Sequence, residues 1–325
     1  MKQALCVLFG LFMLTMPPGV FAQSSFPEKP VRIIVGFAAG AGAGDLIPRL
    51  IGPRLNEWWR QPVIVENMPG QVANIAAARV AKSPPDGYTM VATGDAALTT
   101  NVTLYGKQLP YDPTRDLVPI TLAALSTNIL VVHPSLPVRS VKELVALAKA
   151  NPGKLSYGSA GSGSSQHLGG ELLKKRAGID MLHVPYKSAP PALQDVMAGR
   201  IEMTFGNVVN MLPHVQSGRL RGIAVSSIKR WPAVPDIPTV AESGYPGFEA
   251  VAWFGLSAPG GTPNAIVQKL YQDIAKALAI PEIRTRLTDT GLDVVARSPE
   301  EFLAQIKAEI VSKGQLIRDS GAKPD

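Results

Sequence analysis

The sequence predicts an α/β fold divided into two lobes, and three observations support this prediction. Strand-like apolar runs alternate with helix-like stretches along the chain, an order that is typical of doubly wound α/β folds. The length of 325 residues is enough for two medium domains, each with its own core. Finally, two loops of small residues stand more than a hundred residues apart, each between a strand-like run and a helix-like segment.

Nine runs are predicted as strands, and several are continuously apolar, as expected of parallel strands covered on both faces. They span residues 31–37, 63–66, 88–92, 129–132, 154–157, 181–184, 201–205, 220–225 and 254–258. No segment has the composition of a flexible linker, so we expect the chain to cross between the lobes along extended strands. The first lobe would comprise residues 23–127 and 248–325, and the second lobe residues 128–247.

Two capping boxes predict where helices begin. Ser140 with Glu143 opens a helix to about residue 150, and Ser298 with Glu301 opens a long C-terminal amphipathic helix.

Asp45 is interpreted as the cap of a further helix over residues 46–59, because next to a bound anion its own charge would be repelled. Pro53 should kink or break that helix, since an interior proline costs about 3 kcal/mol. We expect Trp58 and Trp59 to pack the helix end rather than to contact a ligand.

The N-terminus has the pattern of a secretory signal peptide. Lys2 precedes an apolar stretch over residues 4–16, and small residues lead to Ala22, so residues 1–22 should be removed on export to the periplasm. The stretch is too short for a transmembrane anchor, and a buried first helix would not explain the small residues. The single cysteine, Cys6, lies inside the stretch, so neither a lipid anchor nor a disulfide is expected in the mature chain.

The composition is that of a folded globular protein, with 46% hydrophobic and 18% charged residues. The net charge is +7, but lysines and arginines are scattered, without a basic run or an alternation of basic and aromatic residues. We therefore expect no nucleic-acid partner and instead a mildly basic protein that attracts anions.

The first small-residue loop, loop 1, reads Gly-Phe-Ala-Ala-Gly-Ala-Gly-Ala-Gly-Asp over residues 36–45. Small residues let backbone N–H groups approach a ligand closely, and a helix N-terminus adds unpaired donors with partial positive charge. No Gly-Lys-Ser/Thr follows, and the glycine spacing misses the dinucleotide fingerprint. A tight turn explains this loop as well as ligand binding does. Its candidate ligand contacts are Phe37, Ala38, Ala39, Gly40, Ala41, Gly42, Ala43 and Gly44.

The second loop, loop 2, reads Ser-Ala-Gly-Ser-Gly-Ser-Ser over residues 159–165 and adds hydroxyl donors. Hydrogen bonds to a charged partner contribute roughly 1.5–3 kcal/mol each, so a few of them supply the roughly 8 kcal/mol of a micromolar complex. The two loops are predicted to clamp one anion between the lobes without an arginine clamp. The candidate contacts here are Ser159, Ala160, Gly161, Ser162, Gly163, Ser164 and Ser165.

The sequence gives little support for catalysis. The segment 255–259 only partly resembles a Gly-x-Ser-x-Gly nucleophile elbow and lacks the last glycine. The four histidines show no metal-binding spacing. His133 and His183 are interpreted as structural, whereas His167 either contacts the ligand or orients loop 2. We expect no enzyme activity, no metal and no cofactor, although a serine–histidine pair remains open.

Eight short motifs follow one another along the chain. They are Pro-Val-Arg-Ile-Ile-Val at 30–35, Val-Glu-Asn-Met-Pro-Gly at 65–70, Pro-Asp-Gly-Tyr-Thr at 85–89, Leu-Pro-Tyr-Asp-Pro at 109–113, Val-His-Pro-Ser-Leu-Pro at 132–137, Gly-Lys-Leu-Ser-Tyr at 153–157, His-Val-Pro-Tyr-Lys at 183–187 and Asp-Ile-Pro-Thr-Val-Ala-Glu at 236–242. In this order they resemble the Bug-type receptors, the extracytoplasmic solute-binding proteins of tripartite tricarboxylate transporters.

The resemblance implies a periplasmic binding protein of the Venus-flytrap type (type II-like), with two α/β lobes joined by two crossing strands. Such receptors close on a small organic carboxylate and deliver it to the membrane permease of the transporter; we expect a monomer. Loops 1 and 2 would hold the carboxylate, often through ordered water. Thr93, Asp95, Tyr186 and Lys187 would also face the cleft.

The chain departs from the family pattern at two places. Gly36 and Ala39 stand where prolines usually flank the phenylalanine of loop 1, and the loop is one residue longer. Many members carry an aspartate where this chain has Asn207, which offers no carboxylate to an amino group. We therefore predict a ligand without an ammonium group.

Two other functions stay open at this point, an exported hydrolase that uses a serine of loop 2 and an adaptor that docks on a sensor. The ligand itself is open among dicarboxylates, hydroxy acids and aromatic acids, because backbone donors read only carboxylate geometry.

Overall fold

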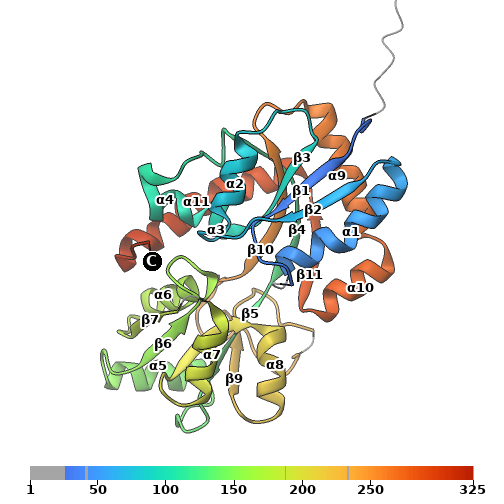
Figure 1. The fold of residues 1–325 in the computed structure, drawn as a ribbon. Helices are drawn as coiled ribbons and strands as arrows, with labels where there is room; N and C mark the ends of the chain where they lie inside the picture. The colour runs from blue at the N-terminus through green and yellow to red at the C-terminus, as the bar shows by residue number, and fades with distance from the viewer. Residues whose placement is uncertain (1–25, 41–42, 187, 233, 325) are drawn as a thin grey trace, which may run out of the picture.

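The computed structural model describes residues 26–40, 43–186, 188–232 and 234–324, and the predicted signal peptide with Cys6 lies outside these ranges. Figure 1 shows two halves stacked one above the other, each a mixed sheet flanked by helices. The predicted α/β fold is therefore confirmed. Within the described ranges, no helix is both long and apolar enough to cross a bilayer.

The upper half is built on a sheet of strand order β11-β4-β10-β3-β1-β2. Its strands are β1 (Val31–Val35), β2 (Val63–Asn67), β3 (Thr89–Gly94), β4 (Leu117–Ser126), β10 (Ala252–Pro259) and β11 (Leu292–Arg297). The first three run parallel, whereas β10 pairs antiparallel with β3 and β4, and β11 pairs antiparallel with β4. Because parallel strands end at one edge, the segments that follow β1 and β3 begin side by side.

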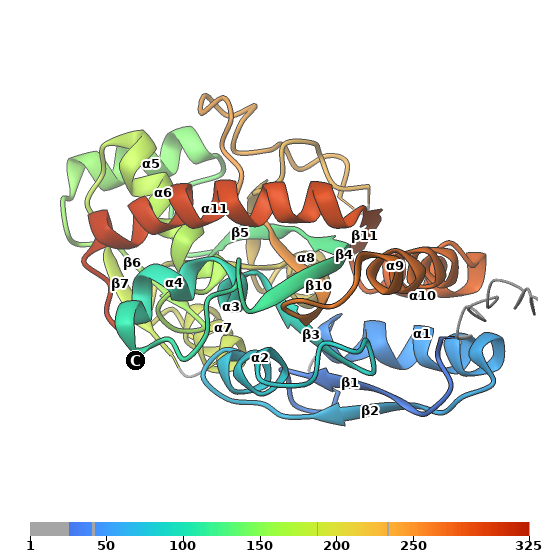
Figure 2. The same cartoon turned by 90° about the horizontal axis from the view of Figure 1, so that it is seen from above.

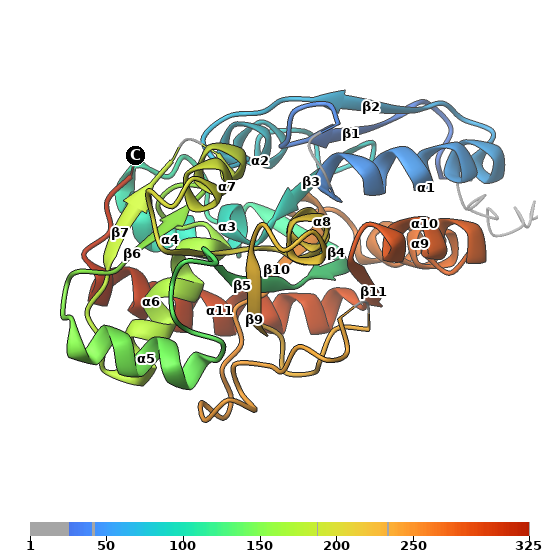
Figure 3. The same ribbon diagram turned by 90° about the horizontal axis from the view of Figure 1, so that it is seen from below.

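Helices cover both faces of this sheet, because side chains alternate along each strand. Ile33 packs in a core with α1, α9 and α10, and Ile34 packs with α2 and α11 on the other face. Figure 3 shows α1 beside α9 and α10. These helices are α1 (Ala43–Trp59), α2 (Asn74–Ala81), α9 (Asn264–Leu278), α10 (Pro281–Asp289) and α11 (Pro299–Ser320).

The lower half has a sheet of order β7-β6-β8-β5-β9, in which β6 runs parallel to β7 and β8 while β5 pairs antiparallel with β8 and β9. One core contains α5 and α6, and α7 and α8 pack on the other face. The elements are β5 (Asn128–Val132), α5 (Val141–Ala150), β6 (Ser156–Ser159), α6 (Ser165–Ala177), β7 (Leu182–Pro185), α7 (Ala189–Met197), β8 (Met203–Asn207), α8 (Val208–Gln216) and β9 (Arg221–Val225).

Two chain segments cross between the halves as one hydrogen-bonded unit. β4 passes into β5 through Thr127, and the return from β9 to β10 passes Ser226 and Ala250. The Ser226 N–H donates to the Asn128 carbonyl at 2.8 Å, and the Ala250 N–H donates to the Ser226 carbonyl at 3.0 Å. The Asn128 amide also donates to the Ala250 carbonyl at 3.2 Å.

The C-terminal helix α11 connects the two halves a second time (Figure 2). In the upper half it packs on β4 and on α4 (Thr100–Tyr105), which follows α3 (Asp95–Leu98) and precedes a 3-10 helix (Gly106–Gln108). Its Ile317 shares a small apolar cluster with Leu104 of α4 and Leu168 of α6. Lys175 of α6 and Asp319 of α11 form an ion pair at 2.5 Å.

All nine predicted strands are present, with shifted ends, but β4 and β11 were missed. Both capping boxes mark real helix starts. The Ser140 hydroxyl accepts the Glu143 N–H at 3.2 Å, and Ser298 and Glu301 form the reciprocal pair of bonds before α11.

Two predictions about α1 are wrong. The helix begins at Ala43, so Asp45 lies in its first turn instead of capping it from outside. The helix also continues unbroken through Pro53 to Trp59. Ile51 and Leu55 are fully buried on either side of that proline, and burial worth about 1.5–3 kcal/mol per side chain outweighs the lost backbone bond. The indole of Trp59 packs in the core, as expected.

Candidate ligand-binding site

Loop 1 leaves β1 beside the end of β3. The Gly36 N–H donates to the Ala92 carbonyl at 3.0 Å, and a Cβ placed on Gly94 would lie 3.3 Å from the tip of the Phe37 ring. The Phe37 ring packs edge-on against Phe254 of β10, with 5.7 Å between centroids. The predicted site residues of loop 1 and of the segment 93–95 are therefore neighbours.

Part of the small-residue content of loop 1 serves close packing. A Cβ on Gly36 would lie 2.3 Å from the Cβ of Ala73, and one on Gly44 would lie 2.1 Å from the Phe37 ring. Gly40 has φ +74° and open space around it. Ala38, Ala39 and Gly40 are exposed, whereas Ala41 and Gly42 lie outside the described residues. The loop is thus both a tight turn at its ends and an accessible stretch of backbone in between.

A polar network anchors loop 1. The buried carboxylate of Asp45, 2% exposed, accepts the Gly40 N–H at 2.7 Å, the Arg49 Nε at 2.8 Å and the Asn67 amide at 2.7 Å. The same Asn67 amide donates to the Phe37 carbonyl at 3.0 Å. Burial alone raises the pKa of Asp45, but the bonds from Arg49, Asn67 and Gly40 outweigh it and hold the pKa below its usual value.

Loop 2 leaves β6 and leads into α6, so it lies at the edge of the lower sheet that faces the upper half (Figure 1). Ser164 caps α6, because its hydroxyl accepts the His167 N–H at 3.3 Å and donates to the Gly161 carbonyl at 2.7 Å. The Gly163 N–H donates to His167 Nδ1 at 3.1 Å. His167 thus orients loop 2, which is one of its two predicted roles.

Ser159 is also engaged within the lower half. Its hydroxyl is fully buried, lies 2.7 Å from His183 Nε2 and accepts the Gly161 N–H at 3.1 Å. His183 stacks between Tyr157 and His167. A serine–histidine contact therefore exists, but the Ser159 hydroxyl oxygen is not accessible from the surface. Ser257, in the partial elbow motif, lies inside β10 and is buried.

The two halves meet at the tip of loop 2. A Cβ on Gly163 would lie 3.1 Å from side-chain atoms of both Thr100 and Leu104 in α4. Since α4 follows Asp95 and α3, the structure brings loop 2 against the part of the upper half that continues from β3.

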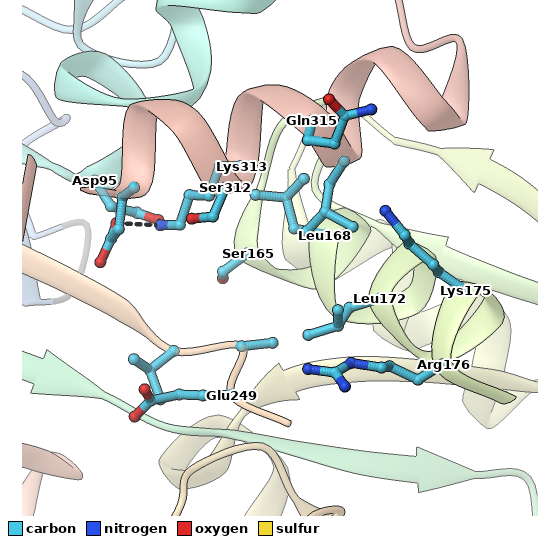
Figure 4. Close-up of a pocket in the computed structure, with 14 residues that line it drawn as sticks. Asp95, Ser165, Leu168, Leu172, Lys175, Arg176, Glu249, Ser312, Lys313 and Gln315 are labelled. Carbon is cyan, nitrogen blue, oxygen red and sulfur yellow. Dashed lines mark hydrogen bonds and ion pairs between the residues drawn. The ribbon is translucent and has the colours of Figure 1, made fainter. Parts of the chain in front are cut away.

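Asp95 and Ser165 come from different halves but line the same cavity. Asp95 is buried and forms an ion pair with Lys313 of α11 at 2.5 Å (Figure 4), and burial raises the pKa of Asp95. Lys313 also pairs with Glu309 at 2.8 Å. A cavity of about 490 Å³ opens beside them between α6 and α11, and Ser165 lines it. Thr93 is buried as well.

The remaining predicted residues lie in the lower half. The Tyr186 hydroxyl donates to Asp195 at 2.6 Å, and burial together with this bond raises the pKa of Tyr186 to about 12. The Asn207 amide donates to the Ser126 hydroxyl where β4 leaves the upper sheet. Ala43 and Gly44 form the first residues of α1. Lys187 lies outside the described residues.

Sequence reasoning missed Arg49, Asn67, Gln166 and His183 as parts of these loops. Gln166 accepts the Ala160 N–H at 2.7 Å through its side-chain oxygen. Asn67 stood in a motif of the family resemblance, and Arg49 lies one helical turn after Asp45, so the i,i+4 spacing was a readable signal. His183 reaches loop 2 only because Tyr157 and His183 are register partners in β6 and β7.

Comparisons with known proteins agree with this architecture. Residues 47–322 match the family described as tripartite tricarboxylate transporter family receptor. A Pseudomonas sp. strain P51 protein from the tcbD–tcbE intergenic region is 37% identical over 96% of this chain and 93% of that protein. Protein BugT of Bordetella pertussis is 33% identical over 98% of both chains.

The chain is also similar to solved structures of periplasmic binding proteins. Rpa4515 of R. palustris, solved with adipate, has a TM-score of 0.80 and 36% identity over 92% of this chain and all of that one. MatC of Rhodopseudomonas palustris, solved with malate, has a TM-score of 0.76 and 33% identity, covering 90% of this chain and all of MatC. The periplasmic binding protein BugD has a TM-score of 0.76 and 33% identity over 92% and 99%.

Proposed function

Because the chain belongs to the receptor family of tripartite tricarboxylate transporters, we propose that it captures a small organic carboxylate between its two halves and delivers it to a membrane permease. The family consists of periplasmic solute-binding receptors, and export of this chain through residues 1–22 completes the proposal. Relatives solved with adipate and with malate support a carboxylate as the ligand class.

The observation that carries the proposal is the placement of the two small-residue loops. Loop 1 exposes the backbone of residues 38–40 at the end of β1, where the Gly40 N–H is donated to Asp45, and loop 2 reaches the upper half at Gly163. An anion between the loops would accept hydrogen bonds from N–H groups of both halves. It would stabilise the closed form by as much as its affinity for the closed form exceeds its affinity for the open form.

We assign the ligand contacts to both loops, to the segment Thr93–Asp95 and to Tyr186, Lys187 and Asn207. The hinge is assigned to the crossings near residues 126–128 and 247–251. The hydroxyls of Ser159 and Ser164 already bind within the lower half, and so do the N–H groups of Ala160, Gly161 and Gly163. Loop 2 would therefore exchange some of these bonds for bonds to the ligand. Asn207 offers an amide where a carboxylate would attract an ammonium group. The expected ligand is therefore a carboxylic acid without an amino group.

A ligand screen with the mature chain tests the function. Carboxylates that include adipate and malate are added in a thermal-shift assay, and hits are measured by calorimetry. A ligand at about 100 times its Kd adds ~2.7 kcal/mol to the free energy of unfolding. An amino acid that binds more tightly than its deaminated analogue would refute the ammonium prediction, and a panel without any hit would refute the carboxylate proposal. Turnover of an ester by the same sample would instead support a hydrolase.

A further inference from the structure

We propose that Asp45, Arg49 and Asn67 form a charge-neutral clamp that holds residues 37–40 of loop 1 in an anion-binding shape and shields the ligand from Asp45. The inference rests on the proposed function, because it concerns the same carboxylate site. None of the three side chains is assigned as a ligand contact; they are positioning residues.

The clamp holds the exposed part of loop 1 from both ends. Asn67, at the end of β2, donates to the Phe37 carbonyl at 3.0 Å, and Asp45, in the first turn of α1, accepts the Gly40 N–H at 2.7 Å. The Asn67 amide also donates to Asp45 at 2.7 Å, so one connected network spans both ends.

The exposed part of loop 1 needs such anchors because its alanine and glycine residues have no side chain that can form a hydrogen bond. Residues 38–40 are alanine and glycine, and fixing each backbone costs about 1–2 kcal/mol of conformational entropy. Gly40 adopts φ +74°, and none of the described residues lies within 4 Å of a Cβ position there, so their packing does not fix this conformation. A loop ordered before the ligand arrives loses less entropy on binding.

The same network reduces the repulsion between the Asp45 carboxylate and a bound anion. A buried carboxylate lies 2.7 Å from an N–H of the loop that is to bind an anion, and like charges at about 4 Å repel by ~1 kcal/mol in water and ~4 kcal/mol near a protein surface. The Arg49 Nε donates to Asp45 at 2.8 Å, and its Nη2 donates to the side-chain oxygen Oδ1 of Asn67 at 2.7 Å. The guanidinium therefore cancels the charge of Asp45 where the ligand approaches.

The two roles have different signatures, which the test uses. Four variants are compared with the wild type: Arg49→Gln, Asp45→Asn with Arg49→Gln, Asn67→Ala and Arg54→Gln. Arg54 is the matched control, because it lies on the same helix, has a side chain that is 43% exposed and pairs with Glu57. Calorimetry gives the Kd for adipate, malate or the tightest carboxylate of the screen, at about 0.01 M and about 1 M salt, between which the Debye length falls from roughly 30 to 3 Å.

Arg49→Gln should weaken binding about tenfold at low salt, equivalent to ~1.4 kcal/mol, and less at high salt. The double variant should recover most of that loss, because the unshielded charge is gone. Asn67→Ala should weaken binding equally at both salt concentrations, and in the ligand-free protein it should speed hydrogen exchange of a peptide covering residues 36–40. Arg54→Gln should match the wild type in all measurements.

A double variant as weak as Arg49→Gln would mean that Arg49 contacts the ligand directly, which overturns the shielding role. Unchanged hydrogen exchange in Asn67→Ala would overturn the clamp. This exchange measurement needs no ligand, so it decides the clamp even if the wild type binds no carboxylate, a result that would refute only the proposed function.

Discussion

Loops 1 and 2 look alike in sequence but are held in different ways. Loop 1 is anchored by side chains outside its glycine and alanine stretch, and its network contains a carboxylate and a guanidinium. Loop 2 is anchored mainly by its own Ser159 and Ser164 and by neutral neighbours such as Gln166. A hydroxyl in a predicted anion-binding loop is therefore not automatically a hydrogen-bond donor to the ligand, because it can be engaged in hydrogen bonds within the protein.

The difference also concerns the contact between the halves. Residues 38–40 of loop 1 are exposed, whereas the tip of loop 2 packs against α4 of the upper half. Loop 1 is thus the accessible part of the site, whereas loop 2 forms a contact between the two lobes. Changes at the two loops should accordingly separate ligand binding from lobe contact.

The largest effect is expected at the start of loop 1. In Gly36→Val the new Cβ would lie 2.3 Å from the Cβ and 3.0 Å from the Cα of Ala73, so backbone must move and the free energy of unfolding should fall by ~3 kcal/mol. Gly40→Ala is the control, since it adds only the strain of a positive φ, about 1 kcal/mol. Urea unfolding measures both, and equal losses would show that loop 1 is not packed at Gly36.

The anchor of loop 2 is tested at His167. His167→Ala removes the acceptor of the Gly163 N–H and a buried ring stacked 4.2 Å from His183, and should cost ~2.5 kcal/mol of folding stability. His167→Asn keeps an acceptor and should recover part of the loss. If His167→Ala instead folds with wild-type stability but loses carboxylate binding, His167 is a ligand contact and does not hold the loop.

The lobe contact of loop 2 should show a smaller effect. Gly163→Ala combines the strain of φ +83° with a Cβ 3.1 Å from Thr100 and Leu104, for a loss of ~1.5 kcal/mol. Gly178→Ala, at φ +61° with open space after α6, carries the strain alone. The excess loss in Gly163→Ala, measured by thermal unfolding, isolates the contact with α4. No excess would mean that loop 2 does not rest on the upper half in solution.

Most of the fold could be predicted because alternating runs and caps are local signals. β4 was missed because Leu117–Ser126 is mostly apolar without strict alternation, and it contains Pro119, which is uncommon inside a strand. β11 was missed because only Thr290 and Gly291 separate it from α10. Pro53 was misjudged because propensity is local, whereas the burial of Ile51 and Leu55 is a tertiary effect.

The loops could be located from the sequence, but their internal bonds could not be predicted. Which partner a serine or aspartate binds depends on register and on loop shape. The pairing of Ser159 with His183 follows from the parallel alignment of β6 with β7. Asp45 faces Gly40 because α1 begins at Ala43, two residues before the predicted cap.

The smallest predicted effect is a difference between the two loops in how their anchors contribute to stability as the pH changes. Folding lowers the pKa of Asp45, through its bonds to Arg49, Asn67 and Gly40 and against the cost of burial. The contribution of Asp45 to the free energy of unfolding is therefore present above the pKa of the unfolded state, and it is lost as the pH falls through the pKa of the folded state. The difference in free energy of unfolding between wild type and Asp45→Asn should be ~1 kcal/mol at neutral pH and should shrink as the pH falls below the unfolded pKa of about 3.9. Ser164→Ala, which removes the neutral cap of α6, should cost a similar ~1 kcal/mol at every pH in that range. A cost for Ser164→Ala that also disappears in acid would show that loop 2 depends on a titrating group, and the contrast between a charged and a neutral anchor would not hold.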